Sequence, residues 1–356
     1  MSVPVLTVQG RLGELDALFR TEECDVQVLL ELVGGISPGG EVARRIIDNG
    51  VEAVFQRRPL WVDTTWQPSV AASPRSAIEF LDRAIEETAE EMVPGFGQPG
   101  LIPVVPVEAD PLLLAEIRLF LEHRWRPVVV RVRRTDRSPA ELARRLDEIA
   151  GALRREVPQL HVVFDEQYVR AATDRRIEQL INTITGVLRR RRCASTTLLA
   201  GSTPLQRGSR RMRVRGRPEV GMWRAVQQEC PGEVRYGDYG VVHPIPRSRE
   251  PGPHMLPNPY LHYTVPGATL SLMRRIPGRR GNRWPSGACE QSFLEIADEL
   301  VHRPEFEGPD FSWGDRNLVR CGTGRGLRVG CSRAWIALAT SHHLVHLSKR
   351  RDTAGL

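Results

Sequence analysis

Lysine is nearly absent from this chain. Lys349 is the only lysine among 50 basic residues, so almost all of the positive charge is arginine, as codon use in a GC-rich genome favours. The formal net charge is +7 and the isoelectric point is near 9.5. Clustered arginine attracts phosphates, but net charge alone is a weak indicator of a partner. The composition therefore leaves nucleic acid open as a partner without requiring it.

Long apolar runs and a signal peptide are also lacking. No stretch approaches the ~18 consecutive apolar residues that a membrane span needs. The opening residues, MSVPVLTVQG, lack a positive region followed by an apolar core. We therefore expect a cytoplasmic protein with no membrane partner. The six cysteines form no C-x-x-C pair, which is typical of isolated thiols in a reducing compartment.

Two motifs that would assign chemistry are missing. The segment after the first apolar run, QGRLGEL, lacks the G-x-G-x-x-G turn of dinucleotide-binding folds, and no H-E-x-x-H zinc motif occurs. What the chain does have is a globular composition, with 356 residues of which 41% are hydrophobic and 26% charged.

Short, continuously apolar segments recur along the first two thirds of the chain. This pattern is typical of parallel strands buried on both faces, and it falls at residues 3–8, 26–33, 60–64, 101–107, 127–132, 161–164, 196–200 and 234–242. Amphipathic helices are predicted at residues 73–92, 110–124, 138–156 and 173–192. Three of them begin with Ser-Pro or Asp-Pro, where the side-chain oxygen caps the helix and proline has no N–H to satisfy.

The repeating unit of strand, loop and capped helix predicts an α/β fold of TIM-barrel type. An open doubly wound parallel sheet is the alternative, because strand order cannot be read from one sequence. We assign residues 1–245 to the barrel and residues 246–356, which begin in a Pro- and Arg-rich stretch, to an α+β extension packed on it. The extension offers one strand at 268–275, which competes with 234–242 to close the barrel, and helices at 290–302 and 334–347.

Four phrases in the last third carry a family resemblance. They are RYGDYGVVHP at 235–244, NPYLHYT at 258–264, PEFEGPDFSWGD at 304–315 and ATSHHLVHL at 339–347. Their order and spacing, with the opening PVLTVQGRLGELDAL, resemble the beta-protein family of phages and bacterial mobile elements. The resemblance implies a phage or phage-defence setting but no agreed reaction. Gln9 and His262 depart from the family pattern, where basic residues are usual, so no role transfers to them.

Polar residues end most of the predicted strands, and in a TIM barrel these ends form the site. Carboxylates there could divide acid and base roles or hold a divalent metal, and arginines would suit a phosphate. We predict catalytic roles for Glu31, Asp63, Glu108, Asp165, Asp238 and His243, and ligand-binding roles for Arg131, Arg133 and Tyr239. The simpler interpretation is that these groups cap helices or form structural ion pairs. The cofactor stays unknown, and we name no metal ligands.

The C-terminal phrases add four ligand-binding candidates. They are Trp313, Asp315, His342 and His343. We predict that Asp315 hydrogen-bonds the histidines, and that the extension completes the site as a lid if this group reaches Asp238 and His243. Asp238→Asn and His343→Ala would then remove activity without unfolding the chain.

Basic residues concentrate at 207–217 and 189–192, a pattern that suits phosphate attraction but offers no aromatic ring for base stacking. Two functions follow. The first is a barrel with an acidic and arginine site that acts on or binds a phosphorylated ligand or nucleic acid. The alternative is a non-catalytic module that binds nucleic acid or protein.

Overall fold

The structure is a computed structural model of the chain. It describes residues 2–21, 24–33, 59–65, 78–79, 81–83, 100–122, 126–133, 137–205, 211–230, 233–246, 258–276, 287–321, 329–349 and 356.

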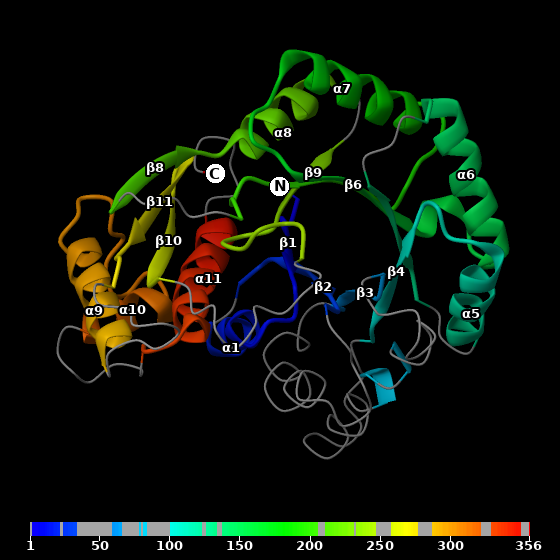
Figure 1. The fold of residues 1–356 in the computed structure, drawn as a ribbon. Coiled ribbons are helices and arrows are strands. Elements are labelled where there is room, and N and C mark those ends of the chain that lie inside the picture. The colour runs from blue at the N-terminus through cyan, green and yellow to red at the C-terminus, as the bar shows by residue number, and fades with distance from the viewer. Residues whose placement is uncertain are drawn as a thin grey trace.

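Eight parallel strands close into a barrel in the order β1-β2-β3-β4-β5-β6-β7-β9 (Figure 1). They are β1 (Val5–Val8), β2 (Gln27–Glu31), β3 (Trp61–Asp63), β4 (Ile102–Pro106), β5 (Val128–Arg133), β6 (Leu160–Tyr168), β7 (Ser195–Gly201) and β9 (Val234–Asp238). β1 pairs with both β2 and β9, which closes the ring. The predicted TIM-like barrel is confirmed, and the open doubly wound sheet is not formed.

Residues on alternate positions of the barrel strands fill its interior. The inner apolar group is Val5, Leu29, Trp61, Ile102, Val104, Val129, Val163, Leu199 and Tyr239. The positions between them pack outward against the helices, so both faces of each strand are buried. This explains why the strands are continuously apolar in the sequence.

The helices that surround the barrel include α1 (Leu12–Arg20), α5 (Pro111–Leu121), α6 (Pro139–Ala152), α7 (Asp174–Leu188) and α8 (Pro218–Glu229). The predicted caps form at α5 and α6. Asp110 accepts a hydrogen bond from Leu113 N at 2.8 Å, and Ser138 exchanges bonds with Glu141 in a capping box. The helix predicted at 73–92 lies almost wholly outside the described residues.

A second sheet stands beside the barrel, with strand order β10-β11-β8 (Figure 1). Its strands are β10 (Tyr260–Val265), β11 (Ala268–Met273) and β8 (Met212–Gly216), all antiparallel. The segment of β11 therefore does not close the barrel, since β9 takes that position. Within the basic segment 207–217, residues Met212–Gly216 form a strand, in which Arg213 and Arg215 alternate with apolar Met212 and Val214.

Among the described residues, three helices follow the second sheet, one more than predicted. They are α9 (Ala288–Val301), α10 (Trp313–Cys321) and α11 (Ser332–Lys349). The described part of residues 246–356 thus has two strands and three helices, where we expected one strand and two helices. NPYLHYT forms β10, and the phrase that ends in FSWGD leads into α10. Both segments are short and rich in polar residues, so neither shows the apolar periodicity from which a strand or helix can be predicted.

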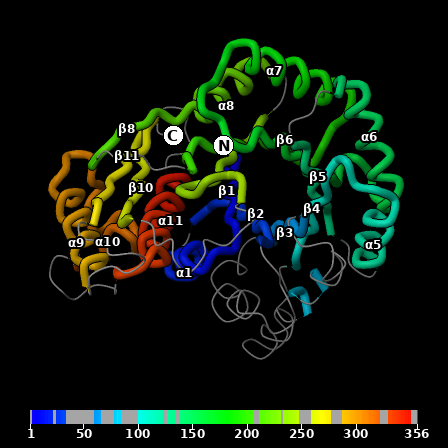
Figure 2. Tube along the Cα trace, in the orientation of Figure 1, coloured from blue at the N-terminus to red at the C-terminus, as the bar shows by residue number. Residues whose placement is uncertain are grey.

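Helix α11 lies between the barrel and the second sheet, against α1 on one side and β10 on the other (Figure 2). Leu344 and Leu347 belong to the barrel core, whereas Trp335 and Leu338 belong to the core under the second sheet. A helix with apolar residues all round must be buried on all sides. A Cβ at Gly314 would lie 2.2 Å from Leu338 O, so α10 packs on α11 at backbone distance.

Within the described part of the chain, no helix is long and apolar enough to cross a membrane.

Candidate functional site

Three carboxylates that we predicted at the strand ends converge on one arginine inside the barrel. Glu31 ends β2, Asp63 ends β3, and Asp165 lies in β6. The Arg131 Nη2 atom lies 2.7 Å from Glu31 Oε1 and 2.9 Å from Asp165 Oδ2, and its Nη1 atom contacts Asp63 Oδ2. All four side chains are buried. We define the acid–arginine cluster as Glu31, Asp63, Arg131, Arg133, Asp165 and Tyr239.

Tyr239 completes the hydrogen bonds of Arg131. The residue follows β9, and its hydroxyl accepts from Arg131 Nη2 at 2.6 Å and donates to Asp165 Oδ1 at 2.8 Å. Arg131 Nε donates to Asp165 Oδ2 at 3.0 Å. The guanidinium of Arg131 is thus engaged by groups of the protein itself, and its role in this geometry is to hold the carboxylates together.

Arg133 occupies a different position, at the carboxyl end of β5. Its Nη2 atom donates to Asp63 Oδ2 at 2.9 Å, and its Nε atom lies 3.6 Å from Asp165 Oδ2. Its side chain is 21% exposed, whereas that of Arg131 is 1% exposed. Arg133 is therefore the cation of the cluster that faces the mouth of the barrel.

Local backbone geometry aims two of the carboxylates. Asp63 Oδ1 accepts a hydrogen bond from Thr65 N at 2.8 Å, which is an Asx turn directly after β3. Asp165 Oδ1 accepts from Gln167 N at 2.8 Å, where the β6–β7 register shifts and Gln167 has a positive φ of 54°. A bulge re-aims side chains next to it. Asp63 is therefore held in one orientation at the end of β3, and Asp165 is held in one orientation within β6.

Burial and the crowding of charges separate the carboxylates electrostatically. Burial raises the pKa of Glu31 to about 7, because it and the repulsion from Asp63 and Asp165 outweigh the attraction of Arg131. Burial alone would also raise the pKa of Asp63, but Arg131 and Arg133 outweigh it, so this pKa is lowered. Glu31 is thus the carboxyl of the cluster that can hold or release a proton near neutral pH.

Glu31→Gln should gain stability relative to the wild-type protein as the pH rises from about 5 to about 8. The pKa of Glu31 is higher in the folded than in the unfolded chain. The stability that Glu31 contributes to the wild-type protein is therefore present below the unfolded pKa and is lost as the pH rises through about 7. The gap in unfolding free energy should reach at most about 3.5 kcal/mol, at about 1.4 kcal/mol per pKa unit. Urea unfolding at a series of pH values measures it. A gap that is constant with pH would contradict the raised pKa.

Asp238 belongs to a second buried group, on the opposite face of β9 from Tyr239. Its Oδ2 atom accepts from Arg217 Nη2 at 2.8 Å and from Tyr236 OH at 2.9 Å. Its Oδ1 atom accepts from Gly240 N at 2.9 Å and lies 3.0 Å from His343 Nε2 on α11. Successive residues of a strand point to opposite faces, so Asp238 and Tyr239 serve different groups although they are neighbours.

Asp315 and His342 form a third group, joined to the second through Thr264. His342 Nδ1 lies 2.9 Å from Asp315 Oδ2, and its Nε2 lies 2.7 Å from Thr264 O. Thr264 Oγ1 lies 2.7 Å from His343 Nδ1. The predicted pairing of Asp315 with His342 is formed, whereas His343 turns to Asp238 instead. These contacts run from the barrel strand β9 through α11 to the second sheet.

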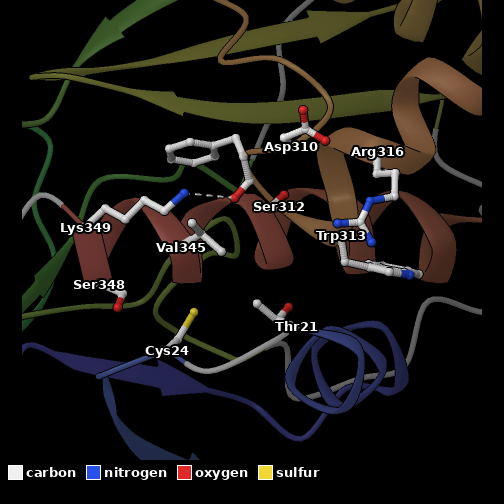
Figure 3. Close-up of a pocket in the computed structure, with 10 residues that line it drawn as sticks. Thr21, Cys24, Asp310, Ser312, Trp313, Arg316, Val345, Ser348 and Lys349 are labelled. Carbon is white, nitrogen blue, oxygen red and sulfur yellow. Dashed lines mark hydrogen bonds between the residues drawn. The ribbon is translucent and has the colours of Figure 1, made fainter.

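The remaining predicted residues stand apart from the acid–arginine cluster. Glu108 is exposed in the turn after β4. His243 is half-buried, with Nδ1 2.8 Å from Thr203 O and its ring 4.8 Å from that of Tyr168. Trp313 lines a separate cavity of about 180 Å³ between α1, α10 and α11, where Lys349 donates to Phe311 O (Figure 3). The extension therefore brings His343 to Asp238 but does not bring Trp313 to the cluster.

A family model described as Beta protein matches residues 3–349, nearly the whole chain. The chain belongs to the Beta protein family. The match covers the barrel and the extension together, so both are part of what this family shares. A comparison with curated proteins gives no match.

The donor groups of this Beta protein are engaged by cations of its own. Among the residues that the structure describes, no three His, Cys, Asp or Glu side chains are placed to hold a metal ion. The carboxylate oxygens that a divalent cation would use contact Arg131 and Arg133 instead. All six cysteines are free thiols.

Several polar residues have structural roles in this Beta protein that the sequence did not predict. Arg217 counted as part of a surface patch, but it is buried and pairs with Asp238 and Glu219. Gln9 donates from Nε2 to His243 O at 2.7 Å and so fastens β1 to the segment after β9. Only contacts between segments that are distant in the sequence reveal these structural roles. The one local signal was the Arg-Pro-Glu sequence at the start of α8.

Proposed function

We propose that this barrel binds a small phosphorylated ligand at its carboxyl mouth and acts on it by acid–base chemistry. One observation carries the proposal: Glu31, Asp63 and Asp165 converge on two arginines, of which Arg133 alone faces the mouth. The carboxyl ends of barrel strands are where TIM-barrel enzymes place their chemistry. We include catalysis in the proposal because burial raises the pKa of Glu31 in this cluster to about 7.

Arg133 would bind the phosphate. A guanidinium offers a planar set of donors that match phosphate oxygens, and the Arg133 side chain is 21% exposed. Its Nε atom lies 3.6 Å from Asp165 and its Nη2 atom 3.7 Å from Glu31, beyond hydrogen-bonding distance. Asp63 holds the side chain in place at the mouth of the barrel.

Glu31 would act as the general acid. A phosphate on Arg133 adds negative charge beside Glu31 and weakens the attraction of that arginine, and both effects favour the protonated carboxyl. Asp63 has a lowered pKa and stays ionised, which keeps Arg131 and Arg133 in position. The rate of a reaction that depends on protonated Glu31 should therefore fall as the pH rises above its pKa.

Arg133→Gln should abolish the stabilisation that phosphorylated small molecules give to the wild-type protein. The measurement is thermal unfolding with a panel of sugar phosphates and nucleotides, where a ligand at 100 times its Kd adds about 2.7 kcal/mol. Arg144→Gln is the matched control, because it removes one charge from a side chain that is 71% exposed on α6. If no compound of the panel stabilises the wild-type protein, or if Arg133→Gln responds as the control does, the proposal is wrong.

A second candidate is a non-catalytic module that binds nucleic acid or a partner protein through β8. The observation in its favour is that β8 forms an edge of the second sheet, with Arg213 exposed and Val214 57% exposed. Edge strands offer backbone groups to a partner. Binding of single-stranded nucleic acid that Arg213→Gln abolishes, without any response to small phosphates, would favour this candidate.

The proposed setting is the cytoplasm of a phage-infected cell, in phage biology or in defence against it. It is supported by the resemblance of this chain to the beta-protein family of phages and bacterial mobile elements. Expression of the chain during phage challenge, with Glu31→Gln beside the wild type, tests the setting.

A further inference from the structure

A cavity of about 500 Å³ opens at the amino end of the barrel, away from the acid–arginine cluster. It lies where the chain leaves α7 and enters β7, beside the start of β9. Its lining is Leu188, Arg189, Arg191, Arg192, Cys193, Ala194, Ser195, Thr196, Glu233 and Arg235. Four arginines thus face one glutamate. The volume is within the range of about 300–1,000 Å³ that is usual for small-molecule pockets.

The protein neutralises only part of this positive charge. Arg191 pairs with Asp147, with Nε 2.6 Å from Oδ1, and the nearby Arg190 donates to Gly186 O at the end of α7. Arg190 stabilises the C-terminus of α7, as cations commonly do, whereas Arg191 joins the end of α7 to α6. Arg189 and Arg192 are exposed and, among the residues described, have no side-chain partner. Contacts within the protein therefore account for Arg190 and Arg191 but not for Arg189 and Arg192.

The geometry points to this cavity as a binding site for a small molecule that carries two or more linked phosphate groups. Like charges in one cavity repel each other, and an anion that bridges them removes the repulsion while it accepts charge-assisted hydrogen bonds. The side chains of Arg189, Arg192 and Arg235 reach the lining from two different segments, α7–β7 and β9. A ligand with several phosphate groups can contact both segments at once.

The arrangement favours a compact ligand over a nucleic-acid strand. A strand needs a basic track that follows its backbone. The other basic segment, which includes Arg213, comes after β7, whereas Arg189 and Arg192 come before it. Arg213 thus belongs to the second sheet, whereas Arg189 and Arg192 lie between α7 and β7 of the barrel, so the two basic segments belong to different parts of the fold.

His161 provides a local reporter for this cavity. Its Nδ1 atom lies 2.7 Å from Ser195 Oγ, which lines the cavity, and its ring lies 5.1 Å from that of Trp61 at the base of the barrel interior. Burial and the charge of Arg235 lower the pKa of His161 to about 4, so the ring is neutral near pH 7. A ligand on Arg235 or Ser195 changes the surroundings of this ring directly.

The test is calorimetric titration of the full chain with tripolyphosphate. It is done in the Arg133→Gln background, so that the proposed site at the barrel mouth does not contribute and its failure would not affect the result. We expect one site per chain and an affinity that falls with salt. Adding Arg189→Gln and Arg192→Gln should weaken binding by about tenfold or more, because two phosphate contacts are lost. The NMR signal of the His161 ring should shift on titration and stop shifting in this variant.

The matched control adds Arg170→Gln and Arg175→Gln instead. These exposed arginines lie at the other end of α7, so the net charge is the same but the cavity is intact, and affinity should change by less than about twofold. Absence of tripolyphosphate binding, equal weakening by both double substitutions, or an unshifted His161 signal would each overturn the inference. Tight binding of a single-stranded oligonucleotide that tripolyphosphate does not displace would overturn it too.

Discussion

Arg131→Met should lower the free energy of unfolding by about 3–5 kcal/mol at neutral pH. The substitution keeps an apolar stem of similar length but removes the cation that contacts Glu31, Asp63 and Asp165, all of which are fully buried. Buried carboxylates without a counter-charge are costly, because the barrel interior solvates them poorly. Urea unfolding followed by circular dichroism measures the change.

The loss of unfolding free energy should depend on pH and on which arginine is removed. At about pH 4 the unpaired carboxyls take up protons more readily, so the gap between Arg131→Met and the wild type should narrow. Arg133→Gln is the control, because Arg133 is partly exposed, and it should cost no more than about 1 kcal/mol. A methionine variant as stable as the wild type would show that Arg131 does not hold the cluster together.

Asp238→Asn should cost about 3 kcal/mol in unfolding free energy. The carboxylate accepts from Arg217, Tyr236 and Gly240 and contacts His343, so the amide loses the charge that Arg217 is buried against and places an N–H donor among donors. This result would differ from our expectation from sequence, in which the variant loses activity and keeps its fold. Differential scanning calorimetry measures the change.

The stability that the Asp238 carboxylate contributes should depend on pH. Burial alone would raise the pKa of Asp238, but His343 and Arg217 outweigh it and lower the pKa in the folded protein. The stabilisation is therefore present above the unfolded pKa of about 3.9 and lost as the pH falls below it. The control is Asp298→Asn, which breaks an exposed pair with His302 on α9 and should change stability by less than about 1 kcal/mol. Equal losses in the two variants would contradict a structural role for Asp238.

The sequence was sufficient to predict the barrel because its strands are buried on both faces, which leaves a continuous apolar signal such as Val128–Val132. The caps of α5 and α6 were predictable since Asp110 and Ser138 act within one helical turn. Three of the strand-end carboxylates could be grouped in advance because parallel strands end at one rim. Their partner, Arg131, was predicted as a ligand-binding residue, although it lies deeper and is covered by the cluster itself.

What escaped prediction depends on contacts between distant segments. Apart from the Arg-Pro-Glu sequence, nothing local distinguishes the buried Arg217 from the exposed Arg213 four residues earlier. The contact of Arg217 with Asp238 on β9 decides which of the two is buried. Likewise, Glu108 follows an apolar predicted strand as Asp63 does, but it lies in the turn after β4 and its side chain is exposed to solvent. A one-residue difference in where a strand ends reverses the face that a side chain occupies.

The position of α11 has a consequence for how the protein matures during translation. The strands of the barrel are complete at Asp238, but the helix that covers the flank beside α1 comes from residues 332–349, after the whole second sheet. A nascent chain grows by about 5–20 residues each second, so that flank stays uncovered for several seconds after β9 has left the ribosome. Leu15 and Ala17 of α1 are apolar and buried in the finished protein. Chaperones that recognise exposed apolar helices would therefore have access to α1 during this interval.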